Sequence, residues 1–200
     1  MINTESLLKY ANMLVQGDIQ CSGIPSIIVQ DDRETYRLDC CSDHELTTED
    51  IKNYSGSADL FKSILIRSEY NAMIICKPEW AGRAIDEGIN LYPTLDDFAM
   101  IVGPMLSLVD RDRTMIERAL KFSSAVMIKN GNLICFGHNI YEAYTCLTVL
   151  EKNAKIYYKA KVFGGAKYVS VPNTILEHIV YKKKYSKNER STQNAAEGRD

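Results

Sequence analysis

The side chains in this sequence that could hold a metal ion or attack a carbonyl group are mainly cysteines and histidines. A catalytic zinc site needs about three nitrogen, sulfur or carboxylate ligands and an open position. No two cysteines are spaced as Cys-x-x-Cys, and several lie in apolar segments, where a free thiol behaves as a small hydrophobic group. We therefore expect reduced, mostly structural thiols at Cys21, Cys40, Cys41, Cys76, Cys135 and Cys146.

Lys77 is a sharper candidate for chemistry because it follows the apolar segment Asn71–Cys76. Burial of a lysine can lower its pKa until the amine becomes a nucleophile that forms an imine with a carbonyl compound. The alternative is a salt bridge, or a side chain that carries its charge out to solvent at the end of a strand. The sequence allows both interpretations.

The elements that must position these side chains are clearest in the second half of the chain. Ala125–Lys129 and Leu133–Phe136 are short apolar runs rich in β-forming residues, which predicts two strands. The dipeptide Asn130-Gly131 between them tolerates the positive φ angles of a tight turn. Asn139 can cap a helix, and apolar residues then recur every three or four positions as far as Gly164-Gly165. The pattern predicts a hairpin followed by one long amphipathic helix.

The remaining elements follow from the same patterns. His138 is expected at a helix start, and His178 on the surface of a later helix. No internal repeat or second core is visible, so residues 1–181 should form one domain, followed by a polar, disordered tail over residues 182–200. The expected helices are Leu7–Val15, Arg113–Phe122 and Pro172–Tyr181, and the expected strands are Ser26–Gln30, Tyr36–Cys40, Asn71–Pro78 and Tyr168–Val171.

Composition and charge restrict the class of protein. A chain of 200 residues with 46% hydrophobic and 25% charged residues suits one soluble domain. A net charge of -2 and a pI near 6.0 give no attraction for nucleic acid or for an anionic membrane. No basic segment followed by an apolar core begins the chain, and no apolar run approaches the roughly 18 residues that cross a bilayer. We therefore expect a cytoplasmic protein without nucleic-acid or membrane partners.

The order of features around the hairpin resembles the C-terminal half of the class II aldolase/adducin family. There a strand ends in a His-Gly turn, a second strand reaches a glycine, and a helix begins with Glu-Ala and continues as Leu-Glu-x-x-Ala. The corresponding residues are Asn130-Gly131, Gly137, Glu142-Ala143 and Leu150–Ala154. The resemblance implies an α/β fold: a single-domain α/β/α sandwich with a central, largely antiparallel sheet covered by helices. It also implies a homo-oligomer, because members of this size commonly form ring-like tetramers.

The resemblance fails at the residues that carry the family's metal chemistry. In the enzymes of the family, the turn histidine and the two histidines of a His-x-His-Pro strand end bind the catalytic zinc. The matching positions here are Asn130, Ile75 and Lys77, followed by Pro78. Isoleucine has no donor atom, and a protonated lysine repels a cation. Zinc would be the family's cofactor, but with its ligands replaced we expect no metal and no other cofactor.

The resemblance also indicates where a ligand would bind. In sugar-phosphate aldolases a glycine-containing loop after the first helix holds the substrate phosphate; here Ser22-Gly23 can still donate hydrogen bonds, although Pro25 cannot. A second loop, at Ser55-Gly56, leads to Asp59, where the family has an acid/base glutamate and where helix capping is the alternative role. The predicted catalytic residues are Lys77, Asn130 and Asp59, and the predicted ligand-binding residues are Ser22, Gly23, Ser55, Gly56, Ile75 and Gly131.

Three functions are compatible with these residues. The first is a degenerate, non-lyase member that binds a small carbonyl or sugar-phosphate-like ligand or acts as a regulatory or assembly subunit. The second is a divergent lyase that acts on a sugar phosphate or another carbonyl compound without zinc, with Lys77 in its pocket. The third is a zinc lyase whose ligands lie elsewhere in the chain. The missing ligands favour the first, since fold alone does not define function.

Overall fold

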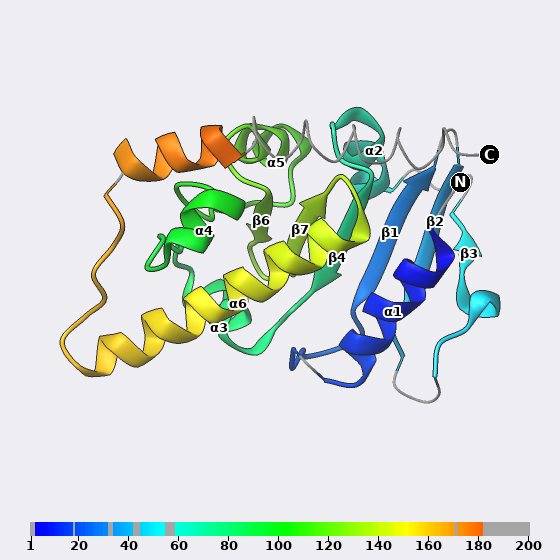
Figure 1. Ribbon diagram of the computed structural model, residues 1–200, viewed down its shortest axis with the longest axis horizontal. Coiled ribbons are helices and arrows are strands. Elements are labelled where there is room, and N and C mark those ends of the chain that lie inside the picture. Colours follow the sequence, from blue (N-terminus) through cyan, green and yellow to red (C-terminus); the bar gives the residue numbers. More distant parts are fainter. Residues whose placement is uncertain are drawn as a thin grey trace, which may run out of the picture.

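The fold is built on one sheet with helices on both faces (Figure 1). The computed structural model describes residues 3–17, 19–31, 34–41, 45–54, 59–170 and 172–181. In these residues, seven strands lie in the order β3-β2-β1-β4-β7-β6-β5, and all neighbours are antiparallel except β5 and β6. The predicted α/β/α sandwich with a largely antiparallel sheet is confirmed.

The helices and strands have the following bounds. The strands are β1 (Ser26–Asp31), β2 (Glu34–Asp39), β3 (Lys52–Asn53), β4 (Ala72–Cys76), β5 (Leu108–Val109), β6 (Ala125–Ile128) and β7 (Leu133–Gly137). The helices are α1 (Thr4–Val15), α2 (Leu60–Arg67), α3 (Glu79–Glu87), α4 (Asp96–Ile101), α5 (Arg113–Leu120) and α6 (Ile140–Val162), with a short 3-10 turn at Thr48–Asp50. Residues 172–181 form a further helix.

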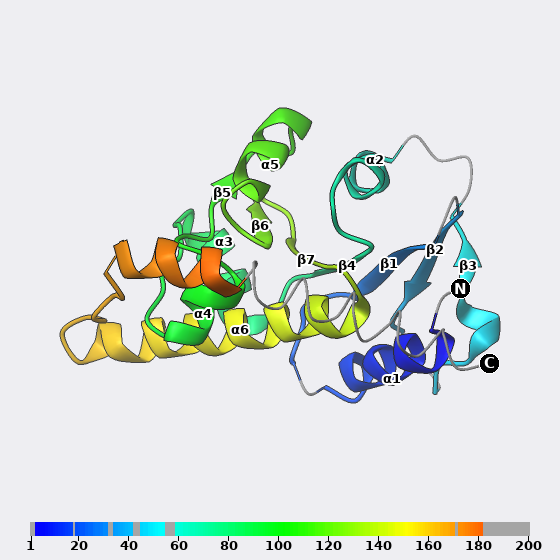
Figure 2. The same cartoon turned by 45° about the horizontal axis from the view of Figure 1, so that its top comes forward.

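The two faces of the sheet carry separate cores. Helices α1, α3, α4 and α6 cover one face, while α2 and α5 cover the other, as the turned view in Figure 2 shows. Successive strand residues point to opposite faces, so Ile74 lies in the α6-side core and its neighbours Met73 and Ile75 in the α2-side core. Every residue of β4 is therefore buried.

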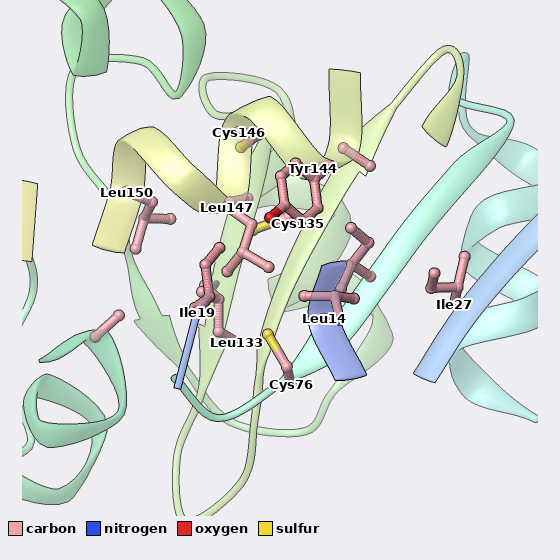
Figure 3. Close-up of a cluster of buried hydrophobic side chains, with 14 of the residues drawn as sticks. Leu14, Ile19, Ile27, Cys76, Leu133, Cys135, Tyr144, Cys146, Leu147 and Leu150 are labelled. Carbon is pink, nitrogen blue, oxygen red and sulfur yellow. The ribbon is translucent and has the colours of Figure 1, made fainter. Parts of the chain in front are cut away.

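The predicted hairpin and long helix are confirmed. Asn130 has a φ of 52°, as a turn residue of this kind requires, and β7 pairs with both β6 and β4. The Asn139 side chain accepts a hydrogen bond from the Glu142 amide at 2.9 Å, which caps α6. Its buried face includes Tyr144, Leu147 and Leu150, which pack with residues of α1 and the sheet in Figure 3.

Two expectations near the C-terminus are wrong. Tyr168–Ser170 forms no strand. The Val169 amide donates a hydrogen bond to the Pro93 carbonyl at 2.9 Å, but in the described part of the chain no strand lies beside this segment to continue a ladder. His178 is buried rather than on the surface, with its Nδ1 atom 2.8 Å from the Met100 carbonyl oxygen. The predicted helix over residues 172–181 is present, whereas the tail from residue 182 lies outside the described residues. In the described part of the chain, no helix is long and apolar enough to cross a bilayer.

Candidate functional site at the end of β4

Three of the segments predicted to carry the site meet at one end of the sheet. Strand β4 ends at Cys76, which pairs with Leu133 directly after the Asn130-Gly131 turn. The loop before β1 reaches the same end, where the Ser22 amide and hydroxyl both donate to the Lys77 carbonyl oxygen, at 2.8 and 3.2 Å. The sheet register therefore places the first loop, the end of β4 and the hairpin turn at the same end of the sheet.

The Lys77 side chain lies against α3 and is held by a carboxylate. Its Nζ atom is 2.6 Å from Asp86 Oδ1, and the lysine side chain remains 28% exposed. A Cβ atom on Gly82 would lie 2.9 Å from Lys77 Cγ, so the glycine makes room for the lysine stem beside the helix. An ammonium group has three N–H donors. One of them is used by Asp86, and the others can bind an oxygen atom of a ligand.

The three positions that the resemblance assigns to zinc do not fit this metal. Ile75 is buried in the α2-side core and has no donor atom, Lys77 forms an ion pair with Asp86, and Asn130 is an exposed turn residue. Within the described ranges, no group of three or more histidine, cysteine, aspartate or glutamate side chains is arranged to hold a metal ion. The donor set differs chemically from the nitrogen, sulfur and carboxylate ligands that zinc requires.

A polar cluster beside Ile75 was not identified from the sequence. Ser26 pairs with Ile75 across β1 and β4, and its hydroxyl donates to Asp39 Oδ1 at 2.6 Å. Arg37 donates from Nε to the same oxygen at 2.9 Å and from Nη2 to the Ser26 hydroxyl at 3.2 Å, with its guanidinium over the Tyr54 ring. The sequence feature that could have identified this cluster is the spacing of Arg37 and Asp39, because residues two apart on a strand lie on the same face of the sheet.

The charges of this cluster stabilise one another. Burial raises the pKa of Asp39, but the hydrogen bonds from Ser26 and Arg37 and the positive charge of Arg37 outweigh burial, so the pKa of this carboxyl lies below its usual value. The Arg37 side chain is 36% exposed and uses only some of its five N–H donors here. The remaining donors can bind an anionic group from solvent.

Glu151 fixes the start of α3, directly after Lys77-Pro78. Its two carboxylate oxygens accept hydrogen bonds from the Trp80 and Ala81 amides at 2.7 and 2.9 Å. These amides are donors that the helix itself leaves unpaired. Burial raises the pKa of Glu151 and is only partly offset by the two amides. Because Glu151 lies in the middle of α6, it joins the long helix to the corner that presents Lys77.

In the described part of the chain, no contact joins Asp59 to Lys77. The Asp59 carboxylate accepts hydrogen bonds from the Phe61 and Lys62 amides at 2.8 and 3.1 Å, which caps α2. Ser55 and Gly56 lie outside the described residues. A cleft of about 470 Å³ between α2 and α5 contains none of the predicted site residues.

Comparison with known proteins supports the architecture. No family model matches the sequence, and no curated protein sequence does. Among solved structures, an L-fuculose 1-phosphate aldolase superposes with a TM-score of 0.74 at 18% identity, over 90% of this chain and 95% of that one. The L-fuculose-1-phosphate aldolase of Thermus thermophilus gives a TM-score of 0.65 at 15% identity, over 80% and 94% of the two chains.

A third similar structure widens the comparison beyond fuculose phosphate aldolases. An aldolase II superfamily protein from Pseudomonas syringae has a TM-score of 0.58 at 13% identity, over 86% of this chain and 82% of that one. Sequence identities this low establish the arrangement of the chain and leave the chemistry to be argued from the residues themselves. The chain has the fold of the class II aldolases, with isoleucine, lysine and asparagine at the positions matching the family's zinc-binding histidines.

Proposed function

We propose that this chain is a degenerate class II aldolase-like protein that is not a zinc-dependent lyase. In this proposal it binds a small carbonyl or phosphorylated-sugar compound at the end of β4, or serves as a regulatory or assembly subunit. The observation that carries the proposal is the identity of Ile75, Lys77 and Asn130, because these side chains offer no set of zinc ligands.

Two separate cations near the end of β4, Arg37 on the α2 side of the sheet and Lys77 against α3, support binding of an anionic or carbonyl oxygen. Lys77 and Arg37 are both partly exposed and both keep N–H donors beyond those bound to carboxylates. The planar guanidinium of arginine binds phosphate and carboxylate groups through two parallel hydrogen bonds. The names of two similar structures include L-fuculose 1-phosphate, which makes this compound a suitable probe.

The test combines metal analysis with ligand titration. Protein purified without chelators or a histidine tag should contain far less than one zinc per chain. Calorimetric titration with L-fuculose 1-phosphate and with dihydroxyacetone phosphate should give binding that is unchanged by EDTA. Loss of a charge-assisted hydrogen bond in Arg37→Ala should weaken binding by roughly tenfold or more. The matched control is Arg83→Ala, which removes an exposed arginine paired with Glu87 on α3. Near-stoichiometric zinc with chelator-sensitive aldol cleavage would overturn the proposal.

A divergent lyase that uses Lys77 is the second candidate. The Lys77 side chain is partly exposed and lies at the same end of the sheet as Ser22 and the hairpin turn. Attack on a carbonyl would require the amine to leave the ion pair with Asp86 and lose a proton. Treatment with borohydride and a panel of aldehydes and ketones should then trap an adduct on Lys77. Peptide mapping that finds Lys77 unmodified throughout would eliminate this candidate.

Self-association is the third element of the proposal. The helix over residues 172–181 buries Thr174 and His178, while aliphatic side chains on its other side stay exposed. Exposed apolar surface of this kind is typical of interaction sites. We expect a homo-oligomer, with a tetramer as the state implied by the resemblance. Light scattering after gel filtration should give a mass above that of one 22.6 kDa chain, and a monomer at micromolar concentration would refute this part. The exposed aliphatic residues are Ile175, Leu176, Ile179 and Val180.

A further inference from the structure

Most of the cysteines gather on the α6 side of the sheet. Cys40, Cys76, Cys135 and Cys146 are part of this core, and Cys21 packs against its edge. Figure 3 shows Cys76, Cys135 and Cys146 within the same cluster of apolar side chains. All six thiols of the chain are free. One pair among them, Cys21 with Cys76, combines contact between thiols with access from solvent.

The backbone holds Cys21 and Cys76 together although 54 residues separate them in the sequence. Cys21 forms an antiparallel bridge with Pro78, and the Ser22 amide donates to the Lys77 carbonyl at 2.8 Å. Across this bridge Cys21 and Cys76 lie two positions out of register, and both side chains contribute to the α6-side core. A hydrogen bond from the Cys76 thiol lowers the pKa of Cys21. Cys21 is partly exposed, whereas Cys76 is 2% exposed. A reagent in solvent can therefore reach Cys21, whereas Cys76 is buried.

A cleft of about 440 Å³ lies next to the segment that leads into Cys21. It is lined by Ile19 and Gln20, which lead directly into Cys21, and by Trp80 and Glu151 on the facing helices. Cys21 is itself partly exposed, so a small oxidant can reach this residue from solvent.

The hydrogen bond favours the thiolate of Cys21. It lowers the pKa of Cys21, against the opposing effects of burial and of the Glu151 charge. The same hydrogen bond, together with burial, raises the pKa of Cys76. Because the thiolate is the reactive form of cysteine, Cys21 is the expected first nucleophile and Cys76 the second.

We propose that Cys21 is a site of reversible oxidation by hydroperoxides and that Cys76 converts the oxidised form into an intramolecular disulfide. The Cys21 thiolate attacks one oxygen of hydrogen peroxide, the O–O bond breaks, and hydroxide takes up a proton and leaves as water. The Cys76 sulfur then attacks the Cys21 sulfur; the S–S bond forms, the S–O bond breaks, and the thiol proton leaves with the hydroxyl group as a second water. The two thiols lose two electrons, and the peroxide gains them.

This modification would tie the loop before β1 covalently to the end of β4. Ser22, next to Cys21, already contacts Lys77, next to Cys76, so the disulfide reinforces a junction that hydrogen bonds alone hold in the reduced protein. A cross-link between distant segments restricts the unfolded chain. The oxidised protein should therefore unfold at a higher urea concentration than the reduced protein.

The test is peptide mapping of the reduced full-length chain after brief treatment with hydrogen peroxide and alkylation of the remaining thiols. A peptide that links Cys21 to Cys76, lighter than the two free peptides by two hydrogen atoms and released by dithiothreitol, is the expected result. In Cys76→Ser, dimedone should label Cys21 as a sulfenic acid, because no second thiol remains to react with it. Cys41→Ser, which alters a partly exposed cysteine outside the pair, should keep the link.

Two results would overturn the proposal. The first is full alkylation of both cysteines after peroxide treatment, and the second is a disulfide from Cys21 to any cysteine other than Cys76. Should Cys76→Ser fail to fold because its thiol is buried, the mapping of the unmodified chain and of Cys21→Ser still decides the question. Cys21→Ser changes a partly exposed residue, and its remaining thiols should show no peroxide-dependent link to Cys76.

Discussion

Gly137 is the position where the sequence most directly controls the packing of the long helix on the sheet. It ends β7, and the first turn of α6 folds back over it. A Cβ atom added at Gly137 would lie 2.4 Å from the Ala143 amide nitrogen and 2.7 Å from the Asn139 carbonyl oxygen. Both are backbone atoms and cannot rotate away, so Gly137→Ala must displace the start of α6 from the sheet.

The size of the effect follows from this displacement. Overpacking of a well-packed site costs about 1–3 kcal/mol and occasionally more; with two backbone atoms in conflict we expect about 3 kcal/mol. For a chain of this length, each kcal/mol lowers the melting temperature by roughly 2–4 °C, so Gly137→Ala should melt about 6–12 °C below the parent protein.

The assay is urea unfolding followed by the fluorescence of Trp80, the only tryptophan of the chain. Gly131→Ala is the matched control, because its added Cβ atom would meet the Ile128 side chain at 3.2 Å, and that side chain can shift by a few tenths of an ångström. The control should lose less than about 1 kcal/mol. Equal losses in the two variants, or no loss in Gly137→Ala, would refute the described packing of α6 against the end of β7.

Two further predictions concern the candidate site. Glu151→Ala leaves the Trp80 and Ala81 amides without their acceptor, which should lower the free energy of unfolding by about 1–3 kcal/mol and change the Trp80 emission maximum. The control is Lys152→Ala, which alters the exposed neighbour of Glu151. Equal stability and emission in the two variants would contradict the capping role of Glu151. Asp39 should give an acid-sensitive contribution to stability, because its pKa in the folded chain lies below its value in the unfolded chain. That contribution is complete above the unfolded pKa, near 4, and is lost as the pH falls through the folded pKa. Because the pair is more than a third exposed, the effect should stay under about 1 kcal/mol. Asp39→Asn should therefore show a flatter decline of stability between pH 5 and pH 2 than the parent chain, and parallel declines would show that Asp39 contributes nothing.

Local patterns in the sequence were sufficient for the parts of the fold that depend on neighbouring residues. The hairpin at Asn130-Gly131 and the helix that follows Asn139 were predicted because turn and capping preferences act within a few residues. The strand predicted at Tyr168–Val171 failed for the converse reason, since its residues favour a strand but its described part has no neighbouring strand to complete the ladder.

The contacts of the candidate site could not be predicted from such patterns. Lys77 was recognised as a candidate, but the sequence did not indicate its partner Asp86, which lies near the end of the following helix, α3. The hydrogen bonds that Glu151 accepts from Trp80 and Ala81 join segments about 70 residues apart, and none of the local signals at either segment indicates the other. The same holds for the contact between Cys21 and Cys76.

The sequence by itself showed that the positions matching the family's zinc-binding histidines hold Ile75, Lys77 and Asn130, because residue types can be read without any coordinates. The periods of its apolar residues predicted individual strands and helices, whereas the α/β/α class was inferred from the resemblance to the class II aldolase/adducin family. Only the tertiary structure decided the partner of each polar group near the end of β4: Lys77 pairs with Asp86, Arg37 with Asp39, and Ser22 with the Lys77 carbonyl. The physical reason is that strand order and register, which set these neighbours, are fixed by the burial of two apolar faces across the whole sheet rather than by any local stretch of sequence.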